Sequence, residues 1–440
     1  MSVAILLGCS CSELTLLLQV GWVGTAVLMA KCQLGLGVLS LPAAFDTLGM
    51  VPGVLCMLSV AFVVTWGSYV IGGFKLNHRE IYGIDDATGV MFGFWGRELI
   101  AICFILFLIF CAGSGLLSIS IGLNAVSSHG ACTAIFVAVA CVAVMLLGSI
   151  RTLSRLRILA WIGLVSILSS ILIVTIAVGV EEKPASAPPG KWTSDYKIIG
   201  NPTFVEGVTA VSTFIFAYAG TPFYFPIVAE MRDPRDYPKS LVLCQSLVTV
   251  TYLVIGIVMY YYSGSYIASP ALGSAGKLLK QISYGIALPG LIVSSTMSTH
   301  LASKHIFLRI LRGSRHVTAD TMTHWVTWLG SVFTVSIVAY CIASGIPVFD
   351  NLVSLIGAFL GTLMCFQPLG CMWLYDNWAK GKTQRTARWV LMVCWSAFVV
   401  LVGMFLMVAG TYGAVIGIID SYHAEGGSSA WSCADNSNSS

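Results

Sequence analysis

Long apolar stretches recur along this chain from end to end, and they restrict its fold more than any other feature. About 20 consecutive apolar residues can cross the hydrocarbon core of a bilayer as an α-helix, which bonds its own backbone groups within the segment. Of 440 residues, 57% are hydrophobic and only 10% are charged, more apolar than a soluble domain of this length needs. The sequence therefore predicts an all-α integral membrane protein, with the lipid bilayer as its surroundings.

Windows of about 20 residues divide the chain into eleven candidate spans. The first and the sixth are longer than one crossing requires, as expected where two half-helices are joined by an unwound stretch. The spans lie near residues 20–49, 52–74, 98–124, 131–149, 154–180, 203–229, 240–262, 282–308, 323–345, 350–375 and 388–412.

The basic residues are distributed unevenly between the loops that join these spans. Of the 23 Lys and Arg residues, 17 fall in one set of loops, five fall in the opposite set, and Lys31 lies inside the first span. Cytosolic loops of membrane proteins carry the excess of Lys and Arg. We therefore expect a cytosolic N-terminus and an extracellular C-terminus.

A proline-rich outward loop, residues 181–202, divides the spans into two sets of similar length. Five spans precede it in residues 20–180, and five follow it in residues 203–378. Transporters are often built from two such halves in inverted orientation. We expect a five-plus-five inverted repeat with discontinuous helices 1 and 6, and helix 11 at 388–412 outside the repeat.

The two ends of the chain differ in composition. Residues 1–19 are apolar and lack the basic start of a signal peptide, so we interpret them as a continuation of the first span or as a mispredicted start. Residues 420–440 are rich in Ser, Gly and Asn, and we expect them to form a disordered polar tail on the outer side.

The 14 cysteines lie mostly inside apolar segments and show no Cys-x-x-Cys pair. The outward loops 181–202 and 263–281 contain none of them. We expect these thiols to pack as small apolar side chains, without a disulfide framework.

Two of the spans are interrupted at their middles by residues that do not favour a helix. The first contains GLGVLSLP at residues 35–42, and the sixth contains FAYAGTP at residues 216–222. Glycine frees the backbone from helical geometry, and proline removes a hydrogen-bond donor. Because unwound backbone at membrane depth is tolerated where it lines a cavity, a break in each of two halves indicates a transporter binding site.

Such breaks present opposite backbone groups to a ligand: N–H groups at the positive end of one half-helix and C=O groups at the negative end of another. That arrangement suits a zwitterion. We expect a carboxylate at the N–H groups of Leu36, Gly37 and Val38, and an ammonium at carbonyls near residues 31–33 and 216–218. The candidate substrate-binding residues are Gly35, Leu36, Gly37, Val38, Phe216, Ala217, Tyr218, Gly220 and Thr221.

The side chains at the breaks limit the substrate class. Neither break contains a carboxylate, which a cationic side chain would require, and an anionic one would require a basic residue in addition to the backbone. We therefore predict a pocket for neutral side chains, which Phe216 and Tyr218 can close. The alternative is that the glycines only permit close helix packing, as small residues do in membranes.

A charge inside a span is costly, which makes Lys31 a candidate for ion coupling. It lies one helical turn before Gly35. Its ammonium fits the place of a sodium ion between the first and eighth spans, near Ser295 and Thr299. Two alternatives stay open: Lys31 extends to the cytosolic interface, and the hydroxyl groups bond to their own helix.

The other titratable residues indicate no catalytic or metal site. Asp46, Glu206 and Asp350 lie towards the outer ends of their spans and are equal candidates for a proton-coupling acid. His129, His300 and His305 are isolated and are not clustered with carboxylates at a spacing that binds metal. We expect neither an enzyme nor a cofactor.

The residues around both breaks also resemble a known family. They are KCQLGLGVLSLPAAFDTLGMVPG from Lys31 and FAYAGTPFYFPIVAEMRDPRDYPKSL from Phe216. Both are similar to the amino acid/auxin permease family (AAAP), most of all to fungal neutral amino acid permeases of the methyltryptophan-resistance type. The resemblance covers about residues 20–415. It implies a leucine-transporter-type fold with eleven spans and amino acid uptake driven by protons, although family members typically begin with a longer hydrophilic tail.

These features together predict a secondary active transporter, at the plasma membrane, that imports neutral aliphatic or aromatic amino acids by proton symport with alternating access. Sodium is the less favoured coupling ion, and no nucleic acid is expected as a partner. A vacuolar exporter, a sodium-coupled member of the same fold and an amino acid sensor (transceptor) stay open as alternatives.

Overall fold

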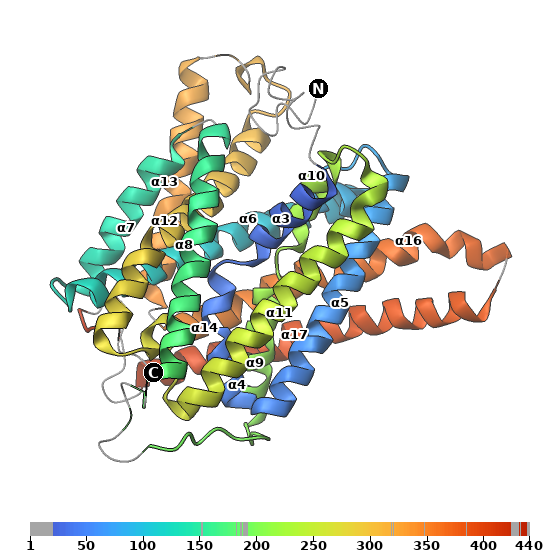
Figure 1. The fold of residues 1–440 in the computed structure, drawn as a ribbon. Coiled ribbons are helices and arrows are strands. Elements are labelled where there is room, and N and C mark those ends of the chain that lie inside the picture. The colour runs from blue at the N-terminus through green and yellow to red at the C-terminus, as the bar shows by residue number, and fades with distance from the viewer. Residues whose placement is uncertain are drawn as a thin grey trace.

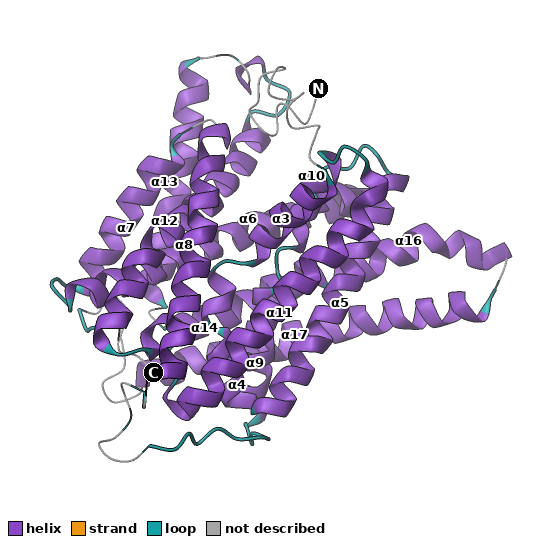
Figure 2. Ribbon diagram, viewed as in Figure 1, coloured by secondary structure: helices purple, strands orange, loops and turns teal. Residues whose placement is uncertain are grey.

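The computed structural model describes residues 21–150, 153–181, 183–184, 187, 192–317, 319, 321–346, 348–383, 385–423, 431 and 433–437. Within these ranges the regular elements are helices joined by loops and short turns, and none is a strand (Figure 2). The apolar segment 1–19 lies outside the described residues, so its interpretation stays a prediction.

The helices lie close to the candidate spans in the sequence. In the first half they are α3 (Trp22–Gln33), α4 (Leu41–Leu48), α5 (Met50–Asn77), α6 (Ile84–Ser127), α7 (Thr133–Gly148) and α8 (Leu153–Val180). In the second half they are α9 (Phe204–Ala217), α10 (Tyr224–Ala229), α11 (Tyr237–Ser263), α12 (Lys277–Ile310), α13 (Met322–Gly345), α14 (Phe349–Leu355), α15 (Thr362–Cys365), α16 (Gln367–Thr383) and α17 (Ala387–His423).

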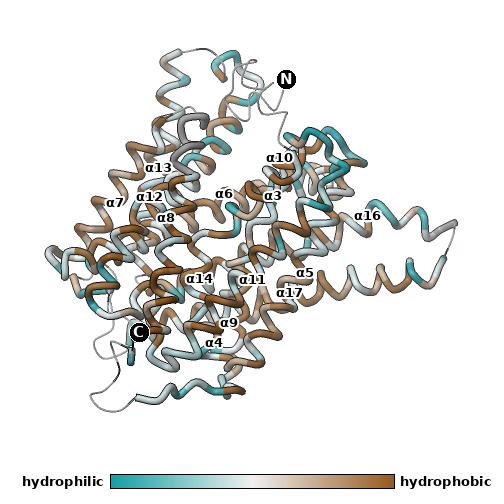
Figure 3. The backbone as a smooth tube through the Cα atoms, viewed as in Figure 1, coloured by the Kyte–Doolittle hydropathy of each residue, from teal (hydrophilic) through white to brown (hydrophobic). Residues whose placement is uncertain are grey.

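Eight helical segments within the described ranges are long and apolar enough to cross a membrane, and α7 is a shorter apolar helix. Apolar residues dominate the helices, and hydrophilic ones gather in the connections (Figure 3). α17 is the least covered by the rest of the chain: Leu401 and Val408 on it are 66% and 68% exposed. Large apolar side chains on an outer surface are expected where the solvent is lipid.

The helices pack in two groups. α6, α7, α12 and α13 pack against one another, with α8 along α12, while α11 packs along α3 and α5, and α9 packs against α4 (Figure 1). α14 and a π-helical stretch at Ile356–Gly361 join α9 to α17, and α16 and α17 extend side by side beyond the rest. α4 and α9 thus lie together, although more than 150 residues separate them.

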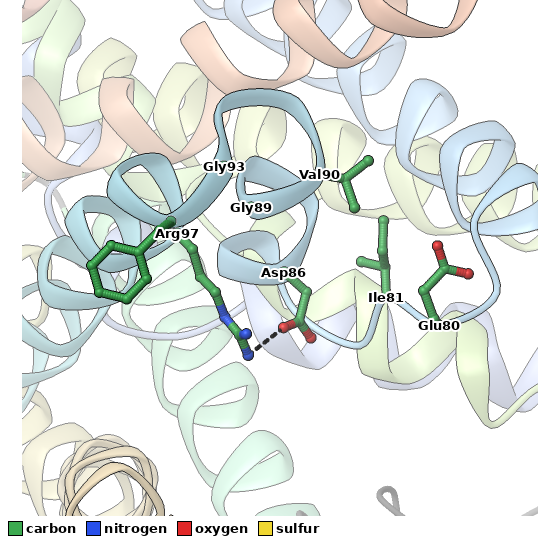
Figure 4. Close-up of a pocket in the computed structure, with 8 residues that line it drawn as sticks. Glu80, Ile81, Asp86, Gly89, Val90, Gly93 and Arg97 are labelled. Atoms are coloured by element: carbon green, nitrogen blue, oxygen red, sulfur yellow. Dashed lines mark hydrogen bonds and ion pairs between the residues drawn. The ribbon is translucent and has the colours of Figure 1, made fainter.

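α6 begins at Ile84, well before the predicted start of its span at 98. The sequence did not predict these additional turns because they are charged; Gly93, with φ of 70°, kinks the helix within them. The kink borders a cleft of about 390 Å³, in which Arg97 donates to Asp86 over 2.9 Å (Figure 4). Its lining residues, which run from Glu80 to Arg97, include none from either break.

The expectation of no disulfide is wrong, because Cys132 and Cys433 are bonded. Cys132 is the N-cap residue of α7, in a short loop, and its partner lies 301 residues later in the C-terminal tail. The two cysteines were missed because the expectation rested on the two longest outward loops. No spacing pattern relates residues so far apart.

The C-terminal tail also differs from the disordered segment expected at 420–440. α17 continues to His423, and the described residues beyond it pack onto the helices. Asn436 is 2% exposed: its side chain accepts a hydrogen bond from Asn124 at 2.7 Å and donates one to Ser120 at 3.3 Å, both on α6. The Trp431 N–H donates to the carbonyl of Ser344 at the end of α13. A disulfide and the buried Asn436 side chain thus hold the described residues 431 and 433–437 against the helices, where composition alone predicts disorder.

Candidate functional site

The predicted break in the first apolar span is present between α3 and α4. Leu34, with φ of −73° and ψ of 86°, and Gly35, with φ of −150° and ψ of −134°, leave the helical region. A 3₁₀ turn at Leu36–Leu39 follows, and α4 starts with Pro42 in its first turn. Proline is suited to that position because the first N–H groups of a helix have no acceptor within it.

The second break separates α9 from α10. α9 ends at Ala217, and a 3₁₀ turn at Thr221–Phe223 precedes α10. Pro222 lies at the start of this turn, and the residues from 212 to 222 are all buried. The helix is therefore interrupted where the sequence predicted it, deep among other helices.

The two breaks are in direct contact through glycines. A Cβ atom placed on Gly37 would lie 2.6 Å from the Cα of Ala217, and one on Gly220 would lie 2.8 Å from the Cγ of Gln33 and 3.0 Å from the carbonyl oxygen of Cys32. Real Cβ atoms do not approach backbone atoms as closely as 2.6 Å, so Gly37 must be glycine for the backbones to meet, and a larger residue at Gly220 would need the Gln33 side chain to move.

Gly35 has different surroundings. A Cβ placed on it would meet no heavy atom within 4 Å, and the residue is only partly buried. Open space therefore adjoins the unwound backbone beside Leu36 and Gly37, whose N–H groups open the next helical stretch. Free N–H groups at the start of a helix beside an open space can bind a carboxylate.

Tyr252, on α11, joins the two breaks and was missed by sequence reasoning. Its hydroxyl lies 2.7 Å from the carbonyl oxygen of Gln33 and 2.9 Å from that of Ala217. These are the last residues of α3 and α9. Two of the carbonyls expected to meet a substrate ammonium thus already have a donor. Tyrosine in an apolar span is usually a packing residue, so no motif singled it out.

Tyr218 contacts α11 instead of standing free over a ligand. Its hydroxyl donates to the Oγ1 of Thr249 at 3.0 Å, and its ring meets that of Tyr252 edge to face, with centroids 5.2 Å apart. Phe216 packs against Gly357 in the π-helical stretch, where a built Cβ would lie 3.1 Å from the Phe216 Cβ. Both aromatic side chains thus pack against neighbouring helical segments and hold the second break in place.

Gln33 is a polar residue at the first break that was not predicted as a binding residue. It is 3% exposed, and neither its Oε1 nor its Nε2 has a hydrogen-bond partner among the described residues. A buried carboxamide without partners is costly, so its position beside Gly220 makes it a candidate for contact with a polar ligand. Gln33 was not predicted because the sequence does not show that its side chain is buried at the end of a helix.

Among the described residues no hydrogen bond or ion pair joins the three candidate ion-coupling residues to one another. Within the described residues the Lys31 ammonium has no ion pair or hydrogen bond, and α3 packs mainly on α11 and α10. The Ser295 hydroxyl, on α12, donates to the carbonyl of Ala112 at 3.0 Å. Thr299, also on α12, lies beside Gly148 of α7. A role for these residues in coupling stays a prediction.

The candidate proton-coupling acids have distinct surroundings. Glu206 forms a capping box with Thr203 at the start of α9, which gives it a structural role. Asp350, in the first turn of α14, accepts a hydrogen bond from the Ser269 hydroxyl. At the opposite end of the second interrupted helix, burial raises the pKa of Glu230 to about 7. Burial thus favours the protonated form of Glu230, while proton coupling by Asp46, Glu206 or Asp350 stays a prediction.

Comparisons with known proteins identify relatives over most of the chain. Residues 19–416 match the family described as transmembrane amino acid transporter protein. A transmembrane transporter of Gibberella moniliformis is 33% identical over 95% of this chain and 88% of its own length. The N amino acid transport system protein of Neurospora crassa is 34% identical over 94% of this chain and 88% of its own length.

The fold resembles a solved structure as well. MhsT, crystallised in complex with L-phenylalanine, superposes with a TM-score of 0.53, although the sequence identity is only 12%; the match covers 89% of this chain and 98% of MhsT. MhsT is a transporter of the leucine-transporter-type fold. The family match is that of a transporter, not of an enzyme. On this evidence the chain belongs to the transmembrane amino acid transporter family.

Proposed function

We propose that this chain imports neutral amino acids into the cytosol by proton symport with alternating access. The observation that carries the proposal is the direct contact of the two breaks beside an open space: Gly37 on Ala217 and Gly220 on Gln33, with room only at Gly35. A ligand in that space would have N–H groups for its carboxylate and the Gln33 carboxamide as a further polar partner.

The architecture that we propose is eleven crossings in a five-plus-five inverted repeat. The helix bounds fit one crossing for each predicted span, with α3 and α4 forming the first and α9 and α10 forming the sixth. The similarity to MhsT over most of both chains supports this arrangement. α17 would then be the additional eleventh span.

A neutral side chain is proposed for the substrate because the residues of both breaks are uncharged. The printed name of the Neurospora relative and the phenylalanine bound to MhsT agree with an amino acid substrate. Proton coupling is proposed because Lys31 provides a fixed positive charge within the first span, and Asp350 and Glu230 are acids in partly buried positions.

The orientation that we propose places the C-terminus outside the cytosol. The excess of basic loop residues supports it, and so does the disulfide between Cys132 and Cys433, because disulfides persist in oxidising compartments. On intact cells, reduction followed by an impermeant thiol reagent should add label that is absent from a Cys132→Ser/Cys433→Ser variant. Equal labelling of both proteins would contradict this orientation.

The test of function is uptake of labelled neutral amino acids by cells that lack their own permeases, with external pH and sodium varied independently. We expect uptake that increases at acid pH, stops with an uncoupler and continues without sodium. Gly285→Val should take up amino acids as the wild type does. Gly285, like Gly35, has open space for a Cβ, but it lies on an exposed part of α12. A strict sodium requirement would refute proton symport, and export from an internal membrane would refute import.

A further inference from the structure

The hydroxyl of Tyr252 lies where the C-terminal ends of two half-helices meet. It is 2.7 Å from the Gln33 carbonyl and 2.9 Å from the Ala217 carbonyl, and the side chain is 0% exposed. A phenol has one proton, which it shares between these two acceptors. One neutral donor therefore serves both breaks.

The position is unusual electrostatically. The C-terminal end of a helix carries partial negative charge, and α3 and α9 present such ends to the same point. In transporters with broken helices, carbonyls at such ends coordinate the coupling cation. Among the described residues no cationic side chain bonds either carbonyl. The two helix ends together favour a cation at this point, but the residue that lies there is a tyrosine.

We propose that Tyr252 takes the place of a coupling cation at the junction of the two breaks and thereby positions them for substrate. It is a positioning residue, because it acts through the backbones of α3 and α9. This inference rests on the proposed function and extends it: no sodium ion is needed at this junction. Removal of the hydroxyl leaves two helix ends that share negative charge without a donor, a site that a small cation can enter.

An ordinary buried tyrosine bond on the same helix provides the matched control. The Tyr237 hydroxyl donates to the carbonyl of Ser68 at 2.8 Å, and the residue is 1% exposed. It joins α11 to α5, away from both breaks, and serves one acceptor. Tyr237→Phe therefore measures what the loss of a buried phenol bond does by itself.

The first measurement needs no amino acid. The melting temperatures of the purified wild type, Tyr252→Phe and Tyr237→Phe are compared in sodium chloride and in choline chloride at equal ionic strength. We expect sodium to stabilise only Tyr252→Phe. The proposal is overturned if Tyr252→Phe does not respond to sodium, or if the wild type responds equally.

A second variant covers the case in which Tyr252→Phe does not fold. Lysine has a similar reach to tyrosine and carries the charge itself, so we expect Tyr252→Lys to fold in choline without a sodium response. Lysine at a junction that did not favour a cation would be strongly destabilising, as we expect for Tyr237→Lys. If Tyr252→Lys also fails to fold in choline, the proposal is overturned.

Binding of labelled phenylalanine then separates this proposal from the proposed function. We expect about tenfold weaker binding by Tyr252→Phe in choline, with partial recovery in sodium, and no change in Tyr237→Phe. Normal binding by Tyr252→Phe in choline would overturn the proposed role of Tyr252 but would leave the proposed function standing. If the wild type binds no neutral amino acid, the proposed function fails, and the sodium-dependent melting still decides the inference.

Discussion

The two breaks contain similar helix-breaking residues but have different surroundings. Around the second break, from 212 to 222, all residues are buried, and Gly220 is in contact with Gln33. The first break is packed on one side only: Gly37 presses on Ala217, whereas Gly35 faces open space. We infer from this difference that the first break lines the open space, and that the second break is held in place by the helices packed around it. Substitutions on the packed side should affect folding, and those on the open side should affect binding.

The largest effect is expected from Gly37→Val. The new Cβ would lie 2.6 Å from the Ala217 Cα, and backbone cannot rotate away as a side chain can. We expect no folded protein, measured as loss of the monodisperse peak in detergent, while Gly285→Val folds normally. A folded Gly37→Val protein with normal uptake would show that the two breaks are not in contact.

Gly220→Ala should have a smaller effect on the same contact. Its Cβ would meet the Cγ of Gln33, which can rotate, and the carbonyl of Cys32, which can shift only slightly. Overpacking of this kind costs about 1–3 kcal/mol, so we expect a folded protein with roughly tenfold weaker amino acid binding. Unchanged binding would mean that the Gln33 side chain moves without consequence for the site.

Thr249→Val tests how the second break is supported. The substitution leaves the buried Tyr218 hydroxyl without its acceptor, at a cost of about 1–3 kcal/mol. We expect a lower melting temperature and only a modest loss of affinity. Thr251→Val is the control, since its exposed hydroxyl bonds only to Leu247 of its own helix. Equal effects of the two substitutions would contradict a supporting role for Tyr218.

The smallest effect concerns Glu230, just after the end of α10. Its pKa is raised from 4.5 to about 7, so its contribution to stability is complete below pH 4.5 and is lost as pH increases through about 7. The melting temperature of the wild type should therefore fall more between pH 4.5 and pH 7 than that of Glu230→Gln. Asp420→Asn, at an exposed position, should follow the wild type. Parallel curves for the wild type and Glu230→Gln would contradict the raised pKa.

Local features were the most predictable from sequence. Apolar length and charge placed the helices to within a few residues in most cases, and the glycines and prolines of 35–42 and 216–222 placed both breaks. These signals are local because helix formation and membrane burial depend on a contiguous run of residues. The early start of α6 at Ile84 was missed because its first turns are charged.

Contacts between distant segments were not predictable. Tyr252 acts on Gln33, 219 residues earlier, and Cys433 pairs with a residue 301 positions before it. Tyrosine and cysteine both occur many times in the chain, so residue type does not distinguish Tyr252 or Cys433 from the others. The packing of the helices determines which tyrosine reaches a break and which two cysteines meet. That packing cannot be read from a single sequence.

The central claim is that the open space beside Gly35 is where the amino acid binds. Its most direct test is equilibrium binding of labelled phenylalanine to purified Gly35→Val and wild-type protein, with melting temperatures measured on the same samples. We predict saturable binding by the wild type and at least tenfold weaker binding by Gly35→Val, with little change in melting temperature, because the new side chain enters empty space. Unchanged phenylalanine affinity in a folded Gly35→Val protein would contradict the account.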